Sequence, residues 1–331
     1  MDVGRVAVMR VERQGGRIQP LDAQWLPAAR DLFNRLTAGL PHCFPAQPDE
    51  FLNWVTAEPH HACDPIRLVV LHNGRVTGLA VGAVCTGPNR DGSFRVAGAG
   101  DASVPAFLCE DRSSADRLLM ALERHFRGVG AHRLVFFDAG EHDNNPPFFN
   151  AGFGACPETV PVVCQALARS GFTLANRELH MACDPEPGQD SSLRREGDGP
   201  EFPTDLPPRA PYPLPEGITV RWSGLPTHPE IDACSGVRNA GGCTGHYLCD
   251  THASPQAARV GYIDWLGINP DFQRQGLGRA LLYRMLQRMS EWPVERVFLT
   301  TGSQNWRAQP LYLSMGFGVV GTSVTMVREG G

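Results

Sequence analysis

Residues 260–289 carry the most regular apolar pattern in the chain. The run Val260–Ile268 is apolar enough to predict a buried strand, and leucines and methionines at helical spacing follow over 280–289. One face of that helix carries residues that recur every four positions, namely Leu277, Leu281, Met285 and Met289. The pattern therefore predicts a strand, a short glycine-containing turn and an amphipathic helix with an ordinary packing face.

The first half of the chain mixes helical and strand patterns in the same way. Helical spacing of apolar residues predicts helices over 21–40, 51–56 and 114–126. Apolar runs predict strands over 66–71, 75–81, 96–104, 133–137 and 162–166, the third of them ended by Pro105. His72-Asn73-Gly74 separates the first two runs, and Asn-Gly is a favoured two-residue turn, so these strands should form a hairpin.

Two segments of the chain echo each other and indicate an internal duplication. Pro146–Phe153 has the same spacing as Pro310–Phe317, which sets a period of about 160 residues. The second copy begins with predicted strands over 217–222, 233–239 and 244–251, and only ten residues separate the first two. Helices barely fit in that space, so walls of any binding site on that side are expected from the first copy or from the linker.

The stretch 184–216 divides the two copies. It holds nine prolines, eight acids and three arginines, a composition that buries little apolar surface. We expect an N-terminal domain over 1–183, a linker over 184–216 and a C-terminal domain over 217–331. A strap packed over one domain is the alternative for the linker, and Pro211–Pro215 would suit it.

Glycines mark the turn between strand 260–268 and the helix that follows. Gln273-Arg274-Gln275-Gly276-Leu277-Gly278-Arg279-Ala280 places a helix N-terminus, with unpaired N–H groups and a positive dipole end, beside two residues without Cβ atoms. Such a turn is an anion site that a phosphate can approach closely.

This order of strand, Q/R-x-x-G-x-G/A turn and helix resembles the GNAT acetyltransferase superfamily. The resemblance extends to a strand at 297–301, to Asn305 and to the N…xLYxxxGF-like segment Pro310–Phe317, and it is good over 260–320. It implies an α/β (mixed α+β) fold of two tandem GNAT-like domains, each with a mostly antiparallel central sheet flanked by helices. It also implies acetyl-CoA as co-substrate and transfer of an acetyl group to a primary amine in a ternary complex.

The resemblance carries roles to individual residues. Coenzyme phosphates would bind at Gln273, Arg274, Gln275, Gly276, Leu277, Gly278 and Arg279, with Asn305 as a further contact or a helix cap. Backbone N–H groups of Leu266, Gly267 and Ile268 would polarise the thioester and pair with pantetheine, and Gly267 also hints at a bulge or a splay of the strand. Tyr312 is expected as general acid, with core packing as the alternative. Tyr262 aligns with the family's catalytic glutamate, and Asp264, two residues on, is a candidate base; His246, Cys249 and His252 are weaker candidates.

The first copy departs from the phosphate signature. Glu110–Ala115 stands in register with Gln273–Gly278, but serine and alanine replace the glycines and acids surround the turn. Phe148 stands where Tyr312 stands in the second copy. We therefore expect the first copy to lack coenzyme binding and to serve as structure.

Composition removes several other classes of function. The chain has 331 residues, 42% of them apolar, a net charge of −5 and arginine as its only basic residue apart from histidine, so no basic field points to nucleic acid. Neither a signal peptide nor a membrane span is predicted, and ten cysteines without a C-x-x-C pair favour a reduced, cytoplasmic protein. His60, His61 and Cys63 are too few for a metal site, so no metal is expected.

The acceptor stays open at this stage. We expect a small-molecule amine, with a protein or peptide amine as runner-up, and a monomer or homodimer. A non-catalytic acyl-CoA-binding module is a third possibility, which Tyr312 argues against. A plain nucleotide-phosphate binder is disfavoured because the turn lacks a P-loop lysine and the G-x-G-x-x-G order.

Overall fold

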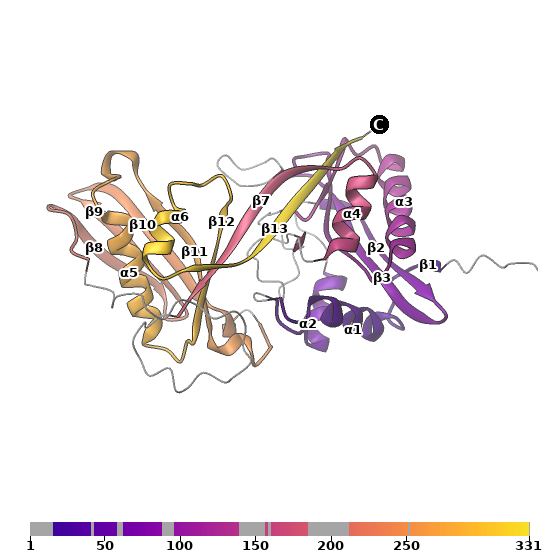
Figure 1. Ribbon diagram of the computed structural model, residues 1–331, viewed down its shortest axis with the longest axis horizontal. Coiled ribbons are helices and arrows are strands. Elements are labelled where there is room, and N and C mark those ends of the chain that lie inside the picture. The colour runs from indigo at the N-terminus through magenta and orange to yellow at the C-terminus, as the bar shows by residue number, and fades with distance from the viewer. Residues whose placement is uncertain are drawn as a thin grey trace, which may run out of the picture.

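A single thirteen-stranded sheet runs through both halves of the molecule (Figure 1). Its strand order is β1-β2-β3-β4-β5-β13-β7-β12-β11-β10-β9-β8, with β6 beside β13. The computed structural model describes residues 16–40, 43–57, 62–87, 96–138, 156–157, 160–184, 212–250 and 252–330. Pro146–Phe153, His60, His61 and most of the linker lie outside these ranges.

The first half contains the two helices and the hairpin that the apolar pattern predicted, preceded by a short strand that it did not predict. Its elements are β1 (Arg17–Pro20), α1 (Leu26–Thr37), α2 (Pro48–Thr56), β2 (Ala62–His72), β3 (Arg75–Cys85), β4 (Ala102–Cys109), α3 (Arg112–Gly128), β5 (Arg133–Phe136), β6 (Cys156–Pro157), α4 (Pro161–Arg169) and β7 (Thr173–Cys183). Asn73 and Gly74 both have positive φ, which confirms the predicted β2–β3 turn.

Two strand predictions in this half are wrong. The strand expected over 96–104 is β4, which begins at Ala102 and continues through Pro105. A bulge in the β3–β4 register beside Pro105 accommodates a residue without an N–H group. The strand expected over 162–166 is helix α4, because Pro161 begins a helical turn and Val163, Ala166 and Leu167 share its buried face.

Strand β7 was not predicted, and it exchanges places with the last strand of the chain. β7 lies between β12 and β13 (Figure 1), and β13 in turn pairs with β5 on its other side. A strand from each half therefore completes the sheet of the other half.

The second half consists of a five-stranded stretch with two helices and the shared last strand. Its elements are β8 (Thr219–Leu225), β9 (His228–Ser235), β10 (Arg238–Tyr247), β11 (Val260–Ile268), α5 (Leu277–Ser290), β12 (Arg296–Gly302), α6 (Gln309–Ser314) and β13 (Gly318–Glu329). The strand predicted over 233–239 is instead the end of β9, a turn and the start of β10, so β10 begins before the predicted Thr244. A tight turn joins β8 to β9, and no helices separate them.

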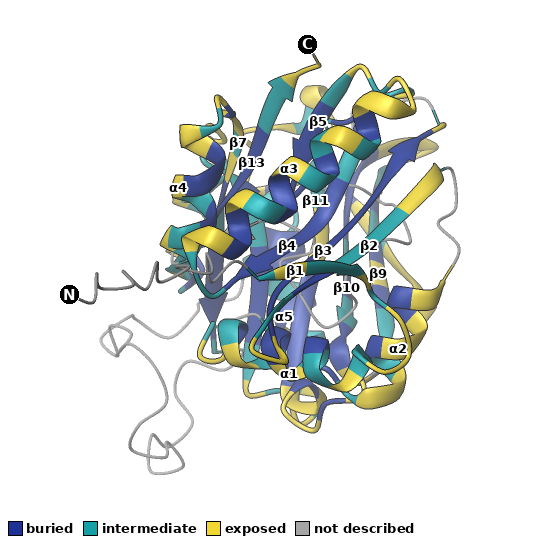
Figure 2. Cartoon of the chain, turned by 90° about the vertical axis from the view of Figure 1, so that its right-hand side faces the viewer, coloured by how far each residue is buried: buried dark blue, intermediate teal, exposed yellow. Residues whose placement is uncertain are grey.

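Helices cover both faces of the sheet in the first half (Figure 2). One cluster packs against α3 and α4, and another packs against α1 and α2. In the second half, α5 and α6 cover one face. On the opposite face Phe44 of the first half packs with Tyr262 and Phe298, and Glu50 Oε1 accepts a hydrogen bond from the N–H of Ala253 at 2.6 Å. Residues of the first half therefore cover part of this face of the second half.

The last linker residues lie on α5. Arg284 Nη1 donates to the Tyr212 carbonyl at 3.0 Å, and the Tyr212 and Tyr283 rings lie 5.7 Å apart. Leu214 packs against the same core. For residues 212–216, the strap is therefore the arrangement observed.

Candidate active site

Strands β11 and β12 separate part of the way along their length. Their parallel pairing covers only Val260–Ile263 with Arg296–Leu299, although β11 continues to Ile268 and β12 to Gly302. The N–H of Asn269 bonds to Ala240, so strand alternation turns the N–H groups of Leu266 and Ile268 toward the opening. The splay thus presents the backbone donors that were expected to hold a thioester arm.

The bulge in β11 lies at Asp264 and not at Gly267. Thr244 pairs with Trp265 and Gly245 pairs with Ile263, which leaves Asp264 as the extra residue. Gly267 is in regular register with Gly242. A Cβ on Gly267 would stand 2.1 Å from Trp265 Cζ2, so a larger residue there would displace the exposed Trp265 ring.

The turn before α5 is braced by its own amide side chains. Gln273 Nε2 donates to the Ile268 carbonyl at 2.9 Å, and Gln275 Nε2 donates to the Asp271 carbonyl at 3.2 Å. Arg274 and Gly276 both have left-handed backbones, with φ of 62° and 85°. Such strain in a non-glycine residue is typical of a functional turn.

The N-terminus of α5 has no side-chain cap. Its first backbone hydrogen bond joins the N–H of Ala280 to the Gly276 carbonyl, so the N–H groups of Leu277, Gly278 and Arg279 point out of the helix end. A Cβ on Gly276 would meet no described atom within 4 Å. The helix end is thus an open anion cradle.

Two arginines flank this cradle differently. Arg274 is exposed in the turn. Arg279 is in the first turn of α5, and its Cζ lies 5.4 Å from the centre of the Tyr212 ring, so the linker strap packs against this guanidinium.

Tyr312 lies in α6 and is 7% exposed, in the core shared with α5. Burial, and then the nearby Cys243 thiol, raise the pKa of its phenol to about 12. The group therefore stays protonated at neutral pH, as a proton donor must.

Asn305 does not cap α6, whose N-cap residue is Ala308. Its side chain donates to Thr301 Oγ1 at 3.1 Å, and its N–H donates to the Gly302 carbonyl at 2.8 Å. Asn305 therefore holds the end of β12 at the opening.

Asp264 is joined to a histidine that sequence reasoning had ranked low. His246 Nδ1 lies 2.8 Å from Asp264 Oδ1, and the His246 ring stacks on His228 at 5.5 Å. His246 is opposite Tyr262 in the β10–β11 ladder, and Tyr262 belongs to the cluster on the face away from α5. The side chain of His246 is therefore on that face too. The Asp264 side chain is 40% exposed and reachable by a substrate.

Tyr262 is buried, and its hydroxyl lies 2.9 Å from Thr300 Oγ1. Burial raises its pKa above the ordinary range, and the Thr300 contact works against that rise. The weaker candidates differ in setting: Cys249 is exposed, whereas His252 is buried against Phe44.

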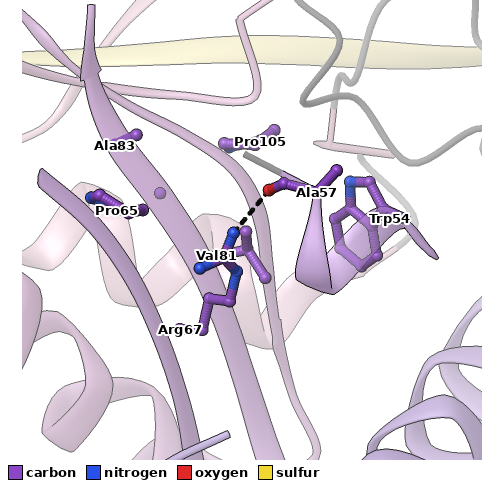
Figure 3. Close-up of a pocket in the computed structure, with 8 residues that line it drawn as sticks. Trp54, Ala57, Pro65, Arg67, Val81, Ala83 and Pro105 are labelled. Carbon is purple, nitrogen blue, oxygen red and sulfur yellow. Dashed lines mark hydrogen bonds between the residues drawn. The ribbon is translucent and has the colours of Figure 1, made fainter. Parts of the chain in front are cut away.

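The corresponding helix end in the first half is closed. The Asp111 carboxylate caps α3, accepting from the N–H and hydroxyl of Ser114 at 2.9 Å each. Glu110 is paired with Arg35 and Arg75. On the far side of this half, a pocket between α2 and β2–β4 contains Arg67, which donates to the Ala57 carbonyl at 2.7 Å, and it has little more than water-sized room (Figure 3).

Across the described ranges, no three His, Cys, Asp or Glu side chains gather as a metal site would require. None of the helices in those ranges has both the length and the apolar character of a membrane crossing.

The family model that matches this chain covers residues in its second half. Residues 207–317 match the model of the Acetyltransferase (GNAT) family. A mycothiol acetyltransferase of Propionibacterium freudenreichii is 41% identical over 64 residues, 19% of this chain and 20% of that protein. The [ribosomal protein bS18]-alanine N-acetyltransferase of Escherichia coli is 40% identical over 52 residues, 16% of this chain and 35% of that protein. The matches thus span about a fifth to a third of these relatives.

Solved structures resemble the whole chain. A tandem GNAT protein from the clavulanic acid biosynthesis pathway has a TM-score of 0.63 at 14% identity, covering 96% of this chain and 99% of that one. A GCN5-related N-acetyltransferase from Sphaerobacter thermophilus has a TM-score of 0.58 at 13% identity, covering 95% of both chains.

The molecule therefore has a tandem GNAT fold. Its residues 207–317 match the model of the GNAT acetyltransferase family, the family that the strand–turn–helix motif resembles.

Proposed function

We propose that the chain is an acetyl-CoA-dependent N-acetyltransferase whose reaction centre is the splay between β11 and β12. The observation that carries the proposal is the uncapped N-terminus of α5 beside that splay, because a helix end without a protein cap favours a phosphate. When bound, acetyl-CoA supplies an activated acetyl group as a thioester.

The turn and helix end would hold the coenzyme. The N–H groups from Arg274 to Arg279, with both guanidiniums, would bind its phosphates, while Gln273 and Gln275 keep the turn in shape. The N–H groups of Leu266 and Ile268 would donate to the pantetheine arm and the thioester oxygen. Gly267, between them, pairs with Gly242 of β10 in regular register.

The proton carriers lie on opposite faces of the sheet, and this separation suits a transfer between two substrates. We assign His246, oriented by Asp264, as the group that takes the amine's proton as the C–N bond forms. Tyr312, on the α5 face, would protonate the sulfur as the C–S bond breaks. Tyr262 would position Thr300 and the ring of His246, 5.5 Å away.

The proposed acceptor is a primary amine of a small molecule. A protein N-terminal amine is the second candidate, because the bS18-alanine acetyltransferase is 40% identical over 52 residues. We further propose the division into 1–183, 184–216 and 217–331, with strands β7 and β13 shared, and action in the cytoplasm as a monomer or homodimer. The ten cysteines of the chain include no C-x-x-C pair, which supports a reducing compartment.

One coenzyme site per chain is proposed, because the Asp111 carboxylate occupies the helix end of the first half. Calorimetry with acetyl-CoA and an amine-panel assay that follows thiol release test these points together. One site and amine-dependent thiol release support the proposal. Binding without release by any amine would favour an acyl-CoA-binding module, and two equal sites would refute the closed first half.

A further inference from the structure

Glu178 is a buried acid that the proposed transfer does not use. It lies on β7, the strand that the first half inserts between β12 and β13, and it is 4% exposed. A carboxylate rarely stays buried in a sheet without a partner for its charge.

The contacts of Glu178 leave half of its carboxyl unsatisfied. Oε1 accepts a long hydrogen bond of 3.4 Å from Asn176, and Oε2 is buried with no hydrogen-bond partner among the described residues. Burial raises its pKa to about 7, Asn176 and Thr300 work against that rise, and Asp138 adds to it. His180, two residues along β7, is bonded to Ser323, and no arginine forms an ion pair with Glu178 in the described part of the chain.

Among the described residues, the position directly across the strand from this carboxyl leaves open space. Glu178 pairs with Gly302 in the β7–β12 ladder, so a Cβ on Gly302 would share the face of Glu178. Such a Cβ would meet no described atom within 4 Å. Gly302 does not have the positive φ that would itself require glycine.

The space borders the splay on the side opposite to His246 and Asp264. Gly302 and Thr300 lie beyond Leu299, the last β12 residue paired with β11. Thr300 is on the same face as Gly302 and Glu178, and its hydroxyl contacts the hydroxyl of Tyr262. His246, on β10, is on the same face, opposite Tyr262 of β11. One acidic group therefore flanks each side of the opening, with Tyr262 and Thr300 between them.

We propose that Glu178 is a specificity residue supplied by the first half, which binds a second cationic amine of an acceptor whose reacting amine lies at His246. The acceptor class is then a diamine or polyamine. A buried carboxyl oxygen without a donor, and a position across the strand that lacks a side chain, fit an ammonium group, which carries three donors and a positive charge. This inference rests on the proposed function for the reacting amine only.

Calorimetry of 1,8-diaminooctane and of octylamine, with CoA present, tests the anchor without turnover, because β7 and β10 lie three strand spacings, about 14 Å, apart. We expect the wild-type protein to bind the diamine at least tenfold more tightly than the monoamine. Glu178→Gln should abolish that preference, and Gly302→Val should lower diamine affinity by filling the space. Glu295→Gln, in an exposed pair with Arg259, is the matched control and should keep the preference.

Equal binding of the two amines by wild type, or a preference that survives Glu178→Gln, would overturn the inference, as would no diamine binding at all. Melting temperature and acetyl-CoA affinity establish that each variant is folded. Thiol release is scored separately. Diamine binding that depends on Glu178 without thiol release would sink the transferase proposal and leave the anchor standing. Thiol release with no Glu178-dependent preference would support the transferase proposal and refute the anchor.

Discussion

The imidazole of His246 is hydrogen bonded through Nδ1 to the carboxylate of Asp264, the bulged residue of β11, at 2.8 Å. The bulge turns this acid out of the strand and toward the neighbouring strand β10. The contact fixes which nitrogen of His246 faces Asp264 and leaves Nε2 for a substrate.

Replacing either member of this pair should slow transfer. Asp264→Asn should lower kcat by on the order of 10²-fold, because the imidazolium formed during transfer loses its carboxylate. Steady-state kinetics with the best amine of the panel measures the effect. Asp232→Asn, on β9 and 3.9 Å from Arg221, serves as control and should stay within about twofold of wild type. Equal activity of both variants would remove Asp264 from the mechanism.

Tyr312→Phe tests the proton donor. The phenol has a pKa of about 12 and is protonated at neutral pH. Removal of its hydroxyl should lower kcat by about 10²-fold while the KM for acetyl-CoA changes little. The packing against Phe317, at 6.0 Å between ring centres, is kept by phenylalanine. Unchanged kcat would make Tyr312 a core residue only.

The anion cradle is tested by a pair of variants that differ in charge alone. Gly276→Asn retains a residue type that tolerates the left-handed backbone, so acetyl-CoA affinity should fall only a few-fold. Gly276→Asp adds a negative charge at the helix end and should weaken binding on the order of 100-fold. Calorimetry compares them. Similar affinities would show that phosphate does not bind at this turn.

Glu178 should make the fold less stable as pH rises. Its folded pKa of about 7 lies above the unfolded value of 4.5, so its contribution is full below pH 4.5 and is lost on the way to pH 7. Between pH 5 and pH 8, wild type should lose up to about 3 kcal/mol of unfolding free energy relative to Glu178→Gln. Urea titrations across that range measure the difference, and parallel curves would contradict it.

His252 should have the opposite effect. Burial, and then the charge of His246, lower its pKa to about 4, so its contribution is full above pH 6.5 and is lost as the pH falls toward 4. Wild type should therefore lose up to about 3 kcal/mol relative to His252→Leu on acidification from pH 7 to pH 4. The loss should loosen the contact with Phe44, whose ring lies 5.6 Å away, and hydrogen exchange of residues 252–259 reports it.

Local patterns predicted much of this fold. The β2–β3 hairpin followed from Asn73-Gly74, and the β11–α5 unit followed from apolar spacing and Gly276. Misassignments arose where local signals were ambiguous. Val162 and Val163 favour strands by propensity, yet helical spacing with Ala166 and Leu167 prevails in α4. Pro105 predicts a strand end, because the bulge that accommodates it depends on pairing with β3 and does not show in the sequence of β4 alone.

The candidate site was predictable only where it is local in sequence. Tyr312 and the turn before α5 belong to continuous motifs. The partner of Asp264 was harder to find, because His246 is on another strand and a bulge sets which residues meet. Glu178 gave no signal at all, since its strand was missed and its position depends on pairing with a residue 124 positions away, Gly302.

The exchange of β7 and β13 ties the order of synthesis to the order of folding. β5, in the first half, has its ladder partner in β13, which is made nearly two hundred residues later. During translation the first half must therefore wait with an unpaired edge between β5 and β7 until residue 329 has emerged. A ribosome-bound chain stopped before β13 would expose that edge, and neither half would have a complete sheet.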